Sequence, residues 1–154
     1  MPDPIYLTPE GAKKLKEELA ELKGPKRKEI AKRLRDAIQM GDLSENADYH
    51  KAKEDQAFLE GRIQELDYVL SKAEVVKDSG KRDEVRVGLK VTVQEKGYDP
   101  EVYYMVGAKE ADSRSNKISN ESPIGKALMG HKKGETVTAE TPGGKIILKI
   151  LKIE

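Results

Sequence analysis

The chain has 154 residues, of which 37% are charged and only 5% are aromatic, and its net charge is +1. This length supports one compact domain or two small ones, and the scarcity of aromatic side chains argues against a large ligand pocket. The absence of cysteine excludes disulfides, thiolate metal sites and cysteine nucleophiles, while the small net charge excludes a polybasic nucleic-acid-binding protein.

A helix is predicted to begin at Thr8, because Thr8 can cap free amides, Pro9 favours a first helical turn and Glu10 would lie at the positive end of the helix dipole. The spacing of its apolar residues slips beside Pro25, which has no N–H and leaves the carbonyl of Glu21 without a partner. We expect a kink there inside one long helix. The apolar seam of this helix consists of Leu15, Leu19, Leu22, Ile30, Leu34 and Ala37.

A second helix is predicted from a seam whose members alternate in steps of three and four residues. Its members are Tyr49, Ala52, Gln56, Leu59, Ile63, Leu66, Leu70 and Ala73. Two amphipathic helices joined by about ten residues can bury their seams only by folding back on each other. The sequence therefore predicts an antiparallel coiled-coil hairpin, roughly 40 Å long at about 1.5 Å per residue.

The apolar pattern changes after residues 77–84, which contain no apolar side chain and are predicted to be a linker. Apolar residues then alternate with others from Val85 to Val93, as in a half-buried strand. Residues 102–106 predict another strand and form the longest apolar run of the chain, which is too short for a signal peptide or a membrane span. We therefore expect a soluble cytoplasmic protein with no membrane partner.

The last part of the chain has the pattern of a β-hairpin. Its strands are predicted at residues 136–141 and 145–153, around a Pro-Gly-Gly turn. A short helix precedes it, with Ser122 as its cap, Pro123 in its first turn and Gly130 at its end.

Together these elements predict an α+β protein of two domains. The first is the helical hairpin at residues 1–76, with an acidic tip near 41–48. The second, after the linker at 77–84, is a small domain at 85–154 with a mainly antiparallel sheet and one short helix.

The predicted turn between the two helices is acidic. Gly41 allows the first helix to end, and Ser44 is expected to cap the second. Asp42, Glu45 and Asp48 could be ordinary acidic residues that stabilise the dipole of the second helix. Alternatively, Asp42 and Glu45 lie three residues apart at the end of a long hairpin, so both carboxylates can face one spot.

Two carboxylates are half of a magnesium site, because Mg²⁺ prefers six oxygens in a near-octahedral shell and commonly takes only one or two carboxylates. The tip alone should bind Mg²⁺ poorly. It would act where another protein supplies further ligands and an RNA phosphate, as in phosphodiester hydrolysis with two metal ions. Asp42 and Glu45 would then be donated to the active site of a partner.

The sequence of the tip carries a specific resemblance. Residues 41–49, Gly-Asp-Leu-Ser-Glu-Asn-Ala-Asp-Tyr, followed by Ala-Lys-Glu at 52–54, resemble the signature of the Gre family of bacterial transcript-cleavage factors. A second set of residues, at 118–119, 122–130 and 141–144, is similar to the C-terminal half of the same family. The resemblance covers nearly the whole chain. Asp48 departs from the Glu that is more usual in the family but keeps the charge.

The resemblance implies a hairpin that enters the secondary channel of RNA polymerase and an FKBP-like C-terminal domain that docks at the rim of the channel. It also implies that Asp42 and Glu45 help to hold the second catalytic Mg²⁺ of the polymerase, while Ser44 orients the tip or the RNA. The polymerase then cleaves the 3′ segment of backtracked nascent RNA. The expected protein is a monomeric activator with no enzymatic activity and no cofactor of its own.

A basic stretch lies in the first predicted helix. Its members Lys28, Lys32 and Arg35 share one helix face by their spacing. They could contact phosphates of the nascent RNA, or they could belong to a solvated face with ion pairs across the hairpin. The two histidines, His50 and His131, fall in separate elements and are expected to be ordinary surface residues rather than metal ligands.

Three alternative functions remain open. An inhibitory Gre paralogue would occupy the channel without promoting cleavage, which the presence of Asp42 and Glu45 disfavours. A coiled-coil scaffold would need an apolar or variable tip, whereas this tip is acidic. An FKBP-like prolyl isomerase would need an aromatic-lined pocket, for which the C-terminal domain offers only Tyr98, Tyr103 and Tyr104.

Overall fold

The structure, a computed structural model, describes residues 4–154, which form two compact units. One unit is the helical segment at residues 12–72. The other contains residues 73–154 together with the described residues up to Gly11. Within the described range, no helix is long and apolar enough to span a membrane.

The first arm of the hairpin contains three helical segments. α1 (Pro9–Glu21) begins directly after Thr8, which caps it as predicted: Thr8 Oγ1 accepts a hydrogen bond from the N–H of Gly11 at 3.0 Å. A π-helical turn (Leu22–Lys26) contains Pro25 and leads into α2 (Arg27–Ile38). Because Pro25 cannot donate to the carbonyl four residues earlier, the regular α-helical pattern is interrupted at this point. The sequence predicted a kink at Pro25 inside one long helix, and the structure has a widened, π-helical turn there that separates α1 from α2.

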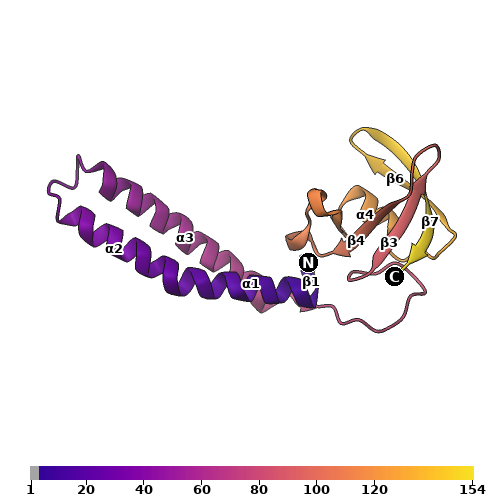
Figure 1. The fold of residues 1–154 in the computed structure, drawn as a ribbon, viewed down its shortest axis with the longest axis horizontal. Helices are drawn as coiled ribbons and strands as arrows, with labels where there is room; N and C mark the ends of the chain where they lie inside the picture. The colour runs from indigo at the N-terminus through magenta and orange to yellow at the C-terminus, as the bar shows by residue number, and fades with distance from the viewer. Residues whose placement is uncertain (1–3) are drawn as a thin grey trace. The chain divides into compact units, whose positions relative to one another are not determined.

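The second arm is α3 (Ala47–Lys72), which runs antiparallel to α1 and α2 (Figure 1). Ile30 of α2 packs against Leu59 and Ile63 of α3. The predicted seam is followed as far as Leu66, after which Val69 is buried and its neighbour Leu70 is only half-buried. A strict seven-residue repeat drifts around a helix of 3.6 residues per turn, so the last turn of α3 buries a different residue.

The C-terminal unit contains a five-stranded sheet in the order β5-β4-β3-β7-β6, in which only β4 and β5 are parallel. α4 (Pro123–Leu128) is capped as predicted, because Ser122 Oγ accepts from the N–H of Gly125 at 3.1 Å. The predicted α+β class is confirmed. The strands are β3 (Lys90–Glu95), β4 (Glu101–Val106), β5 (Lys117–Ser119), β6 (Thr136–Thr141) and β7 (Gly144–Ile153).

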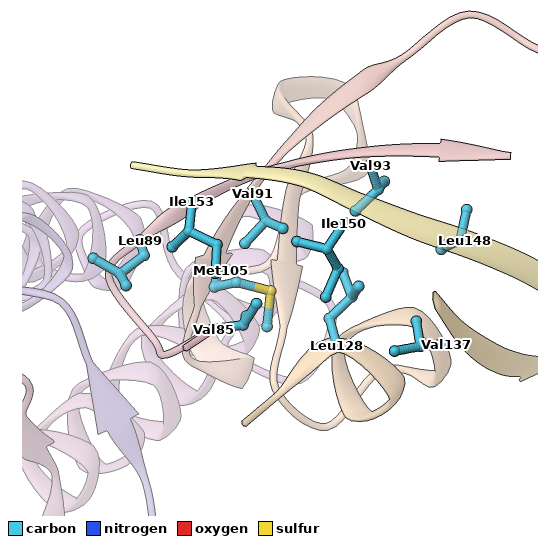
Figure 2. Close-up of a cluster of buried hydrophobic side chains, with 10 residues drawn as sticks. All are labelled: Val85, Leu89, Val91, Val93, Met105, Leu128, Val137, Leu148, Ile150 and Ile153. Atoms are coloured by element: carbon cyan, nitrogen blue, oxygen red, sulfur yellow. The ribbon is translucent and has the colours of Figure 1, made fainter. Parts of the chain in front are cut away.

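The core of this unit lies between one face of the sheet and α4. In Figure 2, Val91 and Val93 of β3 and Ile150 of β7 point toward Leu128 of α4. Met105 of β4 fills the middle of the cluster and is fully buried. Burial of such side chains is the main force that holds a small domain together.

The strand predicted from Val85 to Val93 begins only at Lys90. Val85, Val87 and Leu89 are buried, so the predicted alternation of inward-facing residues is correct. The backbone before Lys90 is nevertheless not a strand, because Gly88 adopts a φ of 99°, outside the extended region.

The described residues before α1, 4–8, belong to the C-terminal unit. β1 (Tyr6–Leu7) pairs in parallel with β2 (Glu74–Val75). Both the N–H and the hydroxyl of Thr8 donate to the carboxylate of Glu110, which lies in the 3₁₀ turn Ala108–Glu110. The sequence places these residues in the predicted hairpin domain at 1–76, because nothing in their pattern reveals a distant strand partner.

Candidate functional site at the hairpin tip

The tip, residues 41–48, follows the end of α2 at Ile38. Gly41 has a φ of 119°, a conformation that favours glycine. The sequence predicted that the chain leaves the first helix at Gly41, and the positive φ of Gly41 agrees with this. The helix itself ends three residues earlier, at Ile38.

Asn46 joins the two arms. Its Oδ1 accepts from the N–H of Tyr49 at 3.0 Å, which caps α3, and its Nδ2 donates to the carbonyl of Ala37 at 2.7 Å. The prediction that Ser44 caps the second helix is therefore wrong. Both residue types are good caps, and the structure shows that Asn46 directly precedes Ala47, where α3 begins.

Ser44 instead orders Asp42. Asp42 Oδ1 accepts from the N–H of Ser44 at 3.0 Å and from its hydroxyl at 2.8 Å. These two hydrogen bonds favour the ionised carboxylate and lower the pKa of Asp42. The ring Nε2 of His50 lies 3.2 Å from the carbonyl oxygen of Ser44. The turn therefore presents an ionised Asp42 from an ordered backbone.

The carboxylates of the tip remain available to a partner. Asp42, Glu45 and Asp48 are exposed, and within residues 4–154 Glu45 makes no side-chain hydrogen bond or ion pair. In the same range, no group of three or more acidic or histidine side chains is arranged to hold a metal ion. Carboxylate oxygens are ligands that Mg²⁺ prefers, and a role of Asp42 and Glu45 in holding this ion stays a prediction.

Apolar side chains flank these carboxylates. Met40 is 71% exposed, Ile38 51% and Leu43 38%. The sequence indicated a polar, acidic tip, and the structure adds these large apolar groups at its borders. Exposed apolar side chains beside functional polar groups are typical of a surface that another protein covers.

The basic stretch of the first arm divides into two sets. Arg27 pairs with Glu60 and Arg33 with Asp55, each at 2.9 Å, so these cations link α2 to α3. Lys28, Lys32 and Arg35 are exposed, and none of them forms an ion pair within the described chain. The structure thus leaves these three charges free to meet a ligand, and their contact with RNA stays a prediction.

The histidines lie apart, one in each unit. The ring of His50 makes an edge-to-face contact with Tyr49, with ring centroids 5.6 Å apart. His131 Nδ1 lies 2.5 Å from the carboxylate of Glu135, and this contact lowers the pKa of Glu135. Neither histidine belongs to a metal cluster of the described residues.

Comparison with known proteins covers both units. Residues 5–75 match the family model described as "Transcription elongation factor, N-terminal", and residues 79–154 match "Transcription elongation factor, GreA/GreB, C-term". Transcription elongation factor GreA of Caldanaerobacter subterraneus subsp. tengcongensis is 52% identical over 99% of both chains, and that of Thermoanaerobacter pseudethanolicus is 51% identical over the same share. Among solved structures, GreA factor homolog 1 of Thermus thermophilus is 27% identical, covers 99% of each chain and has a TM-score of 0.45.

Proposed function

The chain belongs to the GreA/GreB family of transcription elongation factors, and we propose that it stimulates RNA polymerase to cleave backtracked nascent RNA. The hairpin enters the secondary channel of the enzyme, and the C-terminal unit docks at the rim of the channel. The observation that carries this proposal is the tip, where Asp42 and Glu45 present exposed carboxylates from an ordered turn.

Asp42 and Glu45 are proposed to complete a Mg²⁺ site whose other ligands come from the polymerase and the RNA. When bound, such an ion activates water and stabilises charge on the phosphate. Ser44 orients Asp42 through its two hydrogen bonds, and Asn46 holds the turn between the arms. The polymerase itself cleaves the phosphodiester bond, so this protein acts as an activator and needs no cofactor of its own. We further propose that it is a monomer and that it acts in the cytoplasm.

Lys28, Lys32 and Arg35 are proposed to guide the 3′ segment of the RNA toward the tip. Their exposure and the absence of ion pairs in the described chain leave their charge available to phosphates. Reversal of all three charges to Glu should weaken crosslinking to the RNA 3′ end and slow cleavage. Reversal of Lys13, Lys14 and Lys16, which are also exposed on the first arm, is the matched control. If both variants crosslink to the RNA equally well, Lys28, Lys32 and Arg35 do not guide the RNA.

The cleavage activity is tested with purified polymerase stalled in a backtracked complex that carries 3′-labelled RNA. Wild type should accelerate release of a short labelled fragment. The Asp42→Asn, Glu45→Gln variant should lose this acceleration by a factor on the order of 100, the scale seen when groups that stabilise transition-state charge are removed.

The control for that experiment is Glu17→Gln, Glu21→Gln, which removes the same charge from exposed positions on α1. It should cleave like wild type. If wild type binds the polymerase but does not accelerate cleavage, the protein is instead an inhibitory member of the family that occupies the channel.

A further inference from the structure

A small cavity opens at one end of the C-terminal sheet, beside the turn that connects β3 to β4. Its floor is apolar and includes Val93 of β3 and Leu148 of β7, both at least nine-tenths buried. Figure 2 shows these two side chains at the same end of the core cluster. The floor is completed by half-buried aliphatic side chains of α4 and β7.

The cavity has a volume of about 90 Å³. This is far below the roughly 300–1,000 Å³ of a typical small-molecule site. It therefore has room for one side chain rather than for a cofactor or a folded peptide.

The mouth of the cavity is acidic. Glu95, Asp99 and Glu101 line it, and no basic side chain does so. Within residues 4–154 none of the three carboxylates forms an ion pair, and the one hydrogen bond to them comes from the hydroxyl of Tyr103, which donates to Glu101 at 2.6 Å. Three acidic side chains thus line one small cavity, and none of them has an ion-pair partner among the described residues.

The phenol of Tyr103 also lies at this mouth. Burial, followed by the hydrogen bond to Glu101 and the charges of Glu101 and Glu95, raises the pKa of Tyr103 to about 12. These carboxylates disfavour a second anion nearby and favour a cation.

We propose that the cavity receives a lysine or arginine side chain from the rim of RNA polymerase, with its methylene groups against Val93 and Leu148 and its cationic head among Glu95, Asp99 and Glu101. An apolar floor with an anionic mouth matches the two halves of such a side chain, which buries its stem and keeps its head at the surface. This inference rests on the proposed docking of the C-terminal unit and names the contact that would carry it.

The test uses full-length protein with Glu95→Gln and Glu101→Gln, which keep the shape of the mouth and remove two of its three charges. Affinity for core polymerase is measured by competition with labelled wild type at low and high ionic strength. We expect the variant to bind about tenfold more weakly at low salt and to lose part of the salt dependence of binding. Its maximal cleavage rate at saturating concentration should equal that of wild type, because Asp42 and Glu45 are unchanged.

The matched control is Glu74→Gln, Glu154→Gln, which removes the same charge from exposed positions of the same unit that do not line the cavity. Control affinity and salt dependence should match wild type. If the Glu95, Glu101 variant also binds like wild type, the cavity does not take part in docking, while a normal cleavage rate by wild type would leave the proposed function intact.

A different occupant gives a different result. If wild type dimerises in analytical ultracentrifugation and the Glu95, Glu101 variant does not, the cavity binds a second copy of the chain and the polymerase contact is overturned. If wild type neither binds polymerase nor stimulates cleavage, the proposed function itself fails and this inference fails with it.

Discussion

Asn46 stabilises the tip through both ends of its side-chain amide, with Oδ1 at the start of α3 and Nδ2 on the carbonyl of Ala37. Asn46→Ala removes both hydrogen bonds, and we expect the free energy of unfolding to fall by about 1–2 kcal/mol. Asn46→Asp keeps the acceptor that caps α3 and should recover roughly half of this loss. Urea unfolding of both variants, followed by circular dichroism, measures the difference, and identical stability of all three proteins would contradict these roles.

Ser44 lowers the pKa of Asp42 through two hydrogen bonds. Its hydroxyl and N–H hold the pKa of Asp42 below the usual 3.8, so Ser44→Ala should raise this pKa by removing the hydroxyl bond. Because the folded pKa is depressed, the stabilisation from these bonds is complete above the unfolded value and is lost as the pH falls through the folded value. An NMR titration of the Asp42 carboxyl carbon tests this. Ser44→Thr, which retains a hydroxyl, is the control, and an unchanged titration in Ser44→Ala would disprove the effect.

The caps also show where residue-level prediction reached its limit. Ser122 and Thr8 were identified correctly, because Pro follows each of them and marks the first helical turn. At the tip no proline marks the start of α3, and Ser44 and Asn46 are both good caps. The choice depends on the bond from Asn46 to the other arm, which is a tertiary contact.

At the scale of the helices, replacing either of two glycines by alanine should change the stability of the protein, but in opposite directions. Gly61 lies within α3, is exposed, and has open space where a Cβ would be. Gly61→Ala should therefore stabilise the protein by up to about 1 kcal/mol, because alanine loses less backbone entropy in a helix. Thermal unfolding measures this, and a lower melting temperature would show that the face around Gly61 is more restricted than the structure indicates.

Gly11 lies in α1, but a Cβ there would stand 2.0 Å from the carboxylate of Glu110. Gly11→Ala must displace Glu110 and break its hydrogen bonds to Thr8. We expect a loss of about 1–2 kcal/mol in the free energy of unfolding. The double variant Gly11→Ala, Glu110→Ala separates the causes, because the steric clash is absent there and the added cost of the Gly11 substitution should disappear.

The spacing of apolar residues correctly predicted the two arms of the hairpin. The seams of the two arms predicted the hairpin, an apolar run predicted β4, and the Pro-Gly-Gly turn with its flanking segments predicted β6 and β7. Alternation failed from Val85 to Leu89, because buried side chains in a turn can repeat every two residues as they do in a strand. Only the backbone at Gly88, with its positive φ, distinguishes the two.

Considered as a whole molecule, the chain depends on its first described residues for the integrity of the C-terminal unit. Leu7 is fully buried and belongs to β1, which pairs with β2. Leu7→Ala should cost about 2–4 kcal/mol by removing buried methyl groups and leaving a cavity. Hydrogen exchange should accelerate in β1 and β2 more than in β3 and β7, because Leu7 belongs to β1 and is not part of the core cluster of β3 and β7. Leu43→Ala, at a partly exposed position of the tip, is the control and should change stability by less than about 0.5 kcal/mol.

The long-range parts of the fold were the ones that sequence reasoning missed. A two-residue strand such as β1 has no periodicity to detect, and its partner β2 lies on the far side of the whole hairpin. The acidic tip was identified because Asp42 and Glu45 are close in sequence. The cavity between β3, β7 and α4 was not predicted from the sequence, because the residues that line it come from separate parts of the chain.

The pairing of β1 with β2 also has a consequence during synthesis. Leu7 leaves the ribosome about 70 residues ahead of its partner Val75, a delay of roughly 3–14 s at about 5–20 residues per second. The arms of the hairpin are complete before Val75 is made, so they can close while the N-terminal strand is still unpaired. We therefore expect the hairpin of the nascent chain to begin to close before β1 can pair with β2.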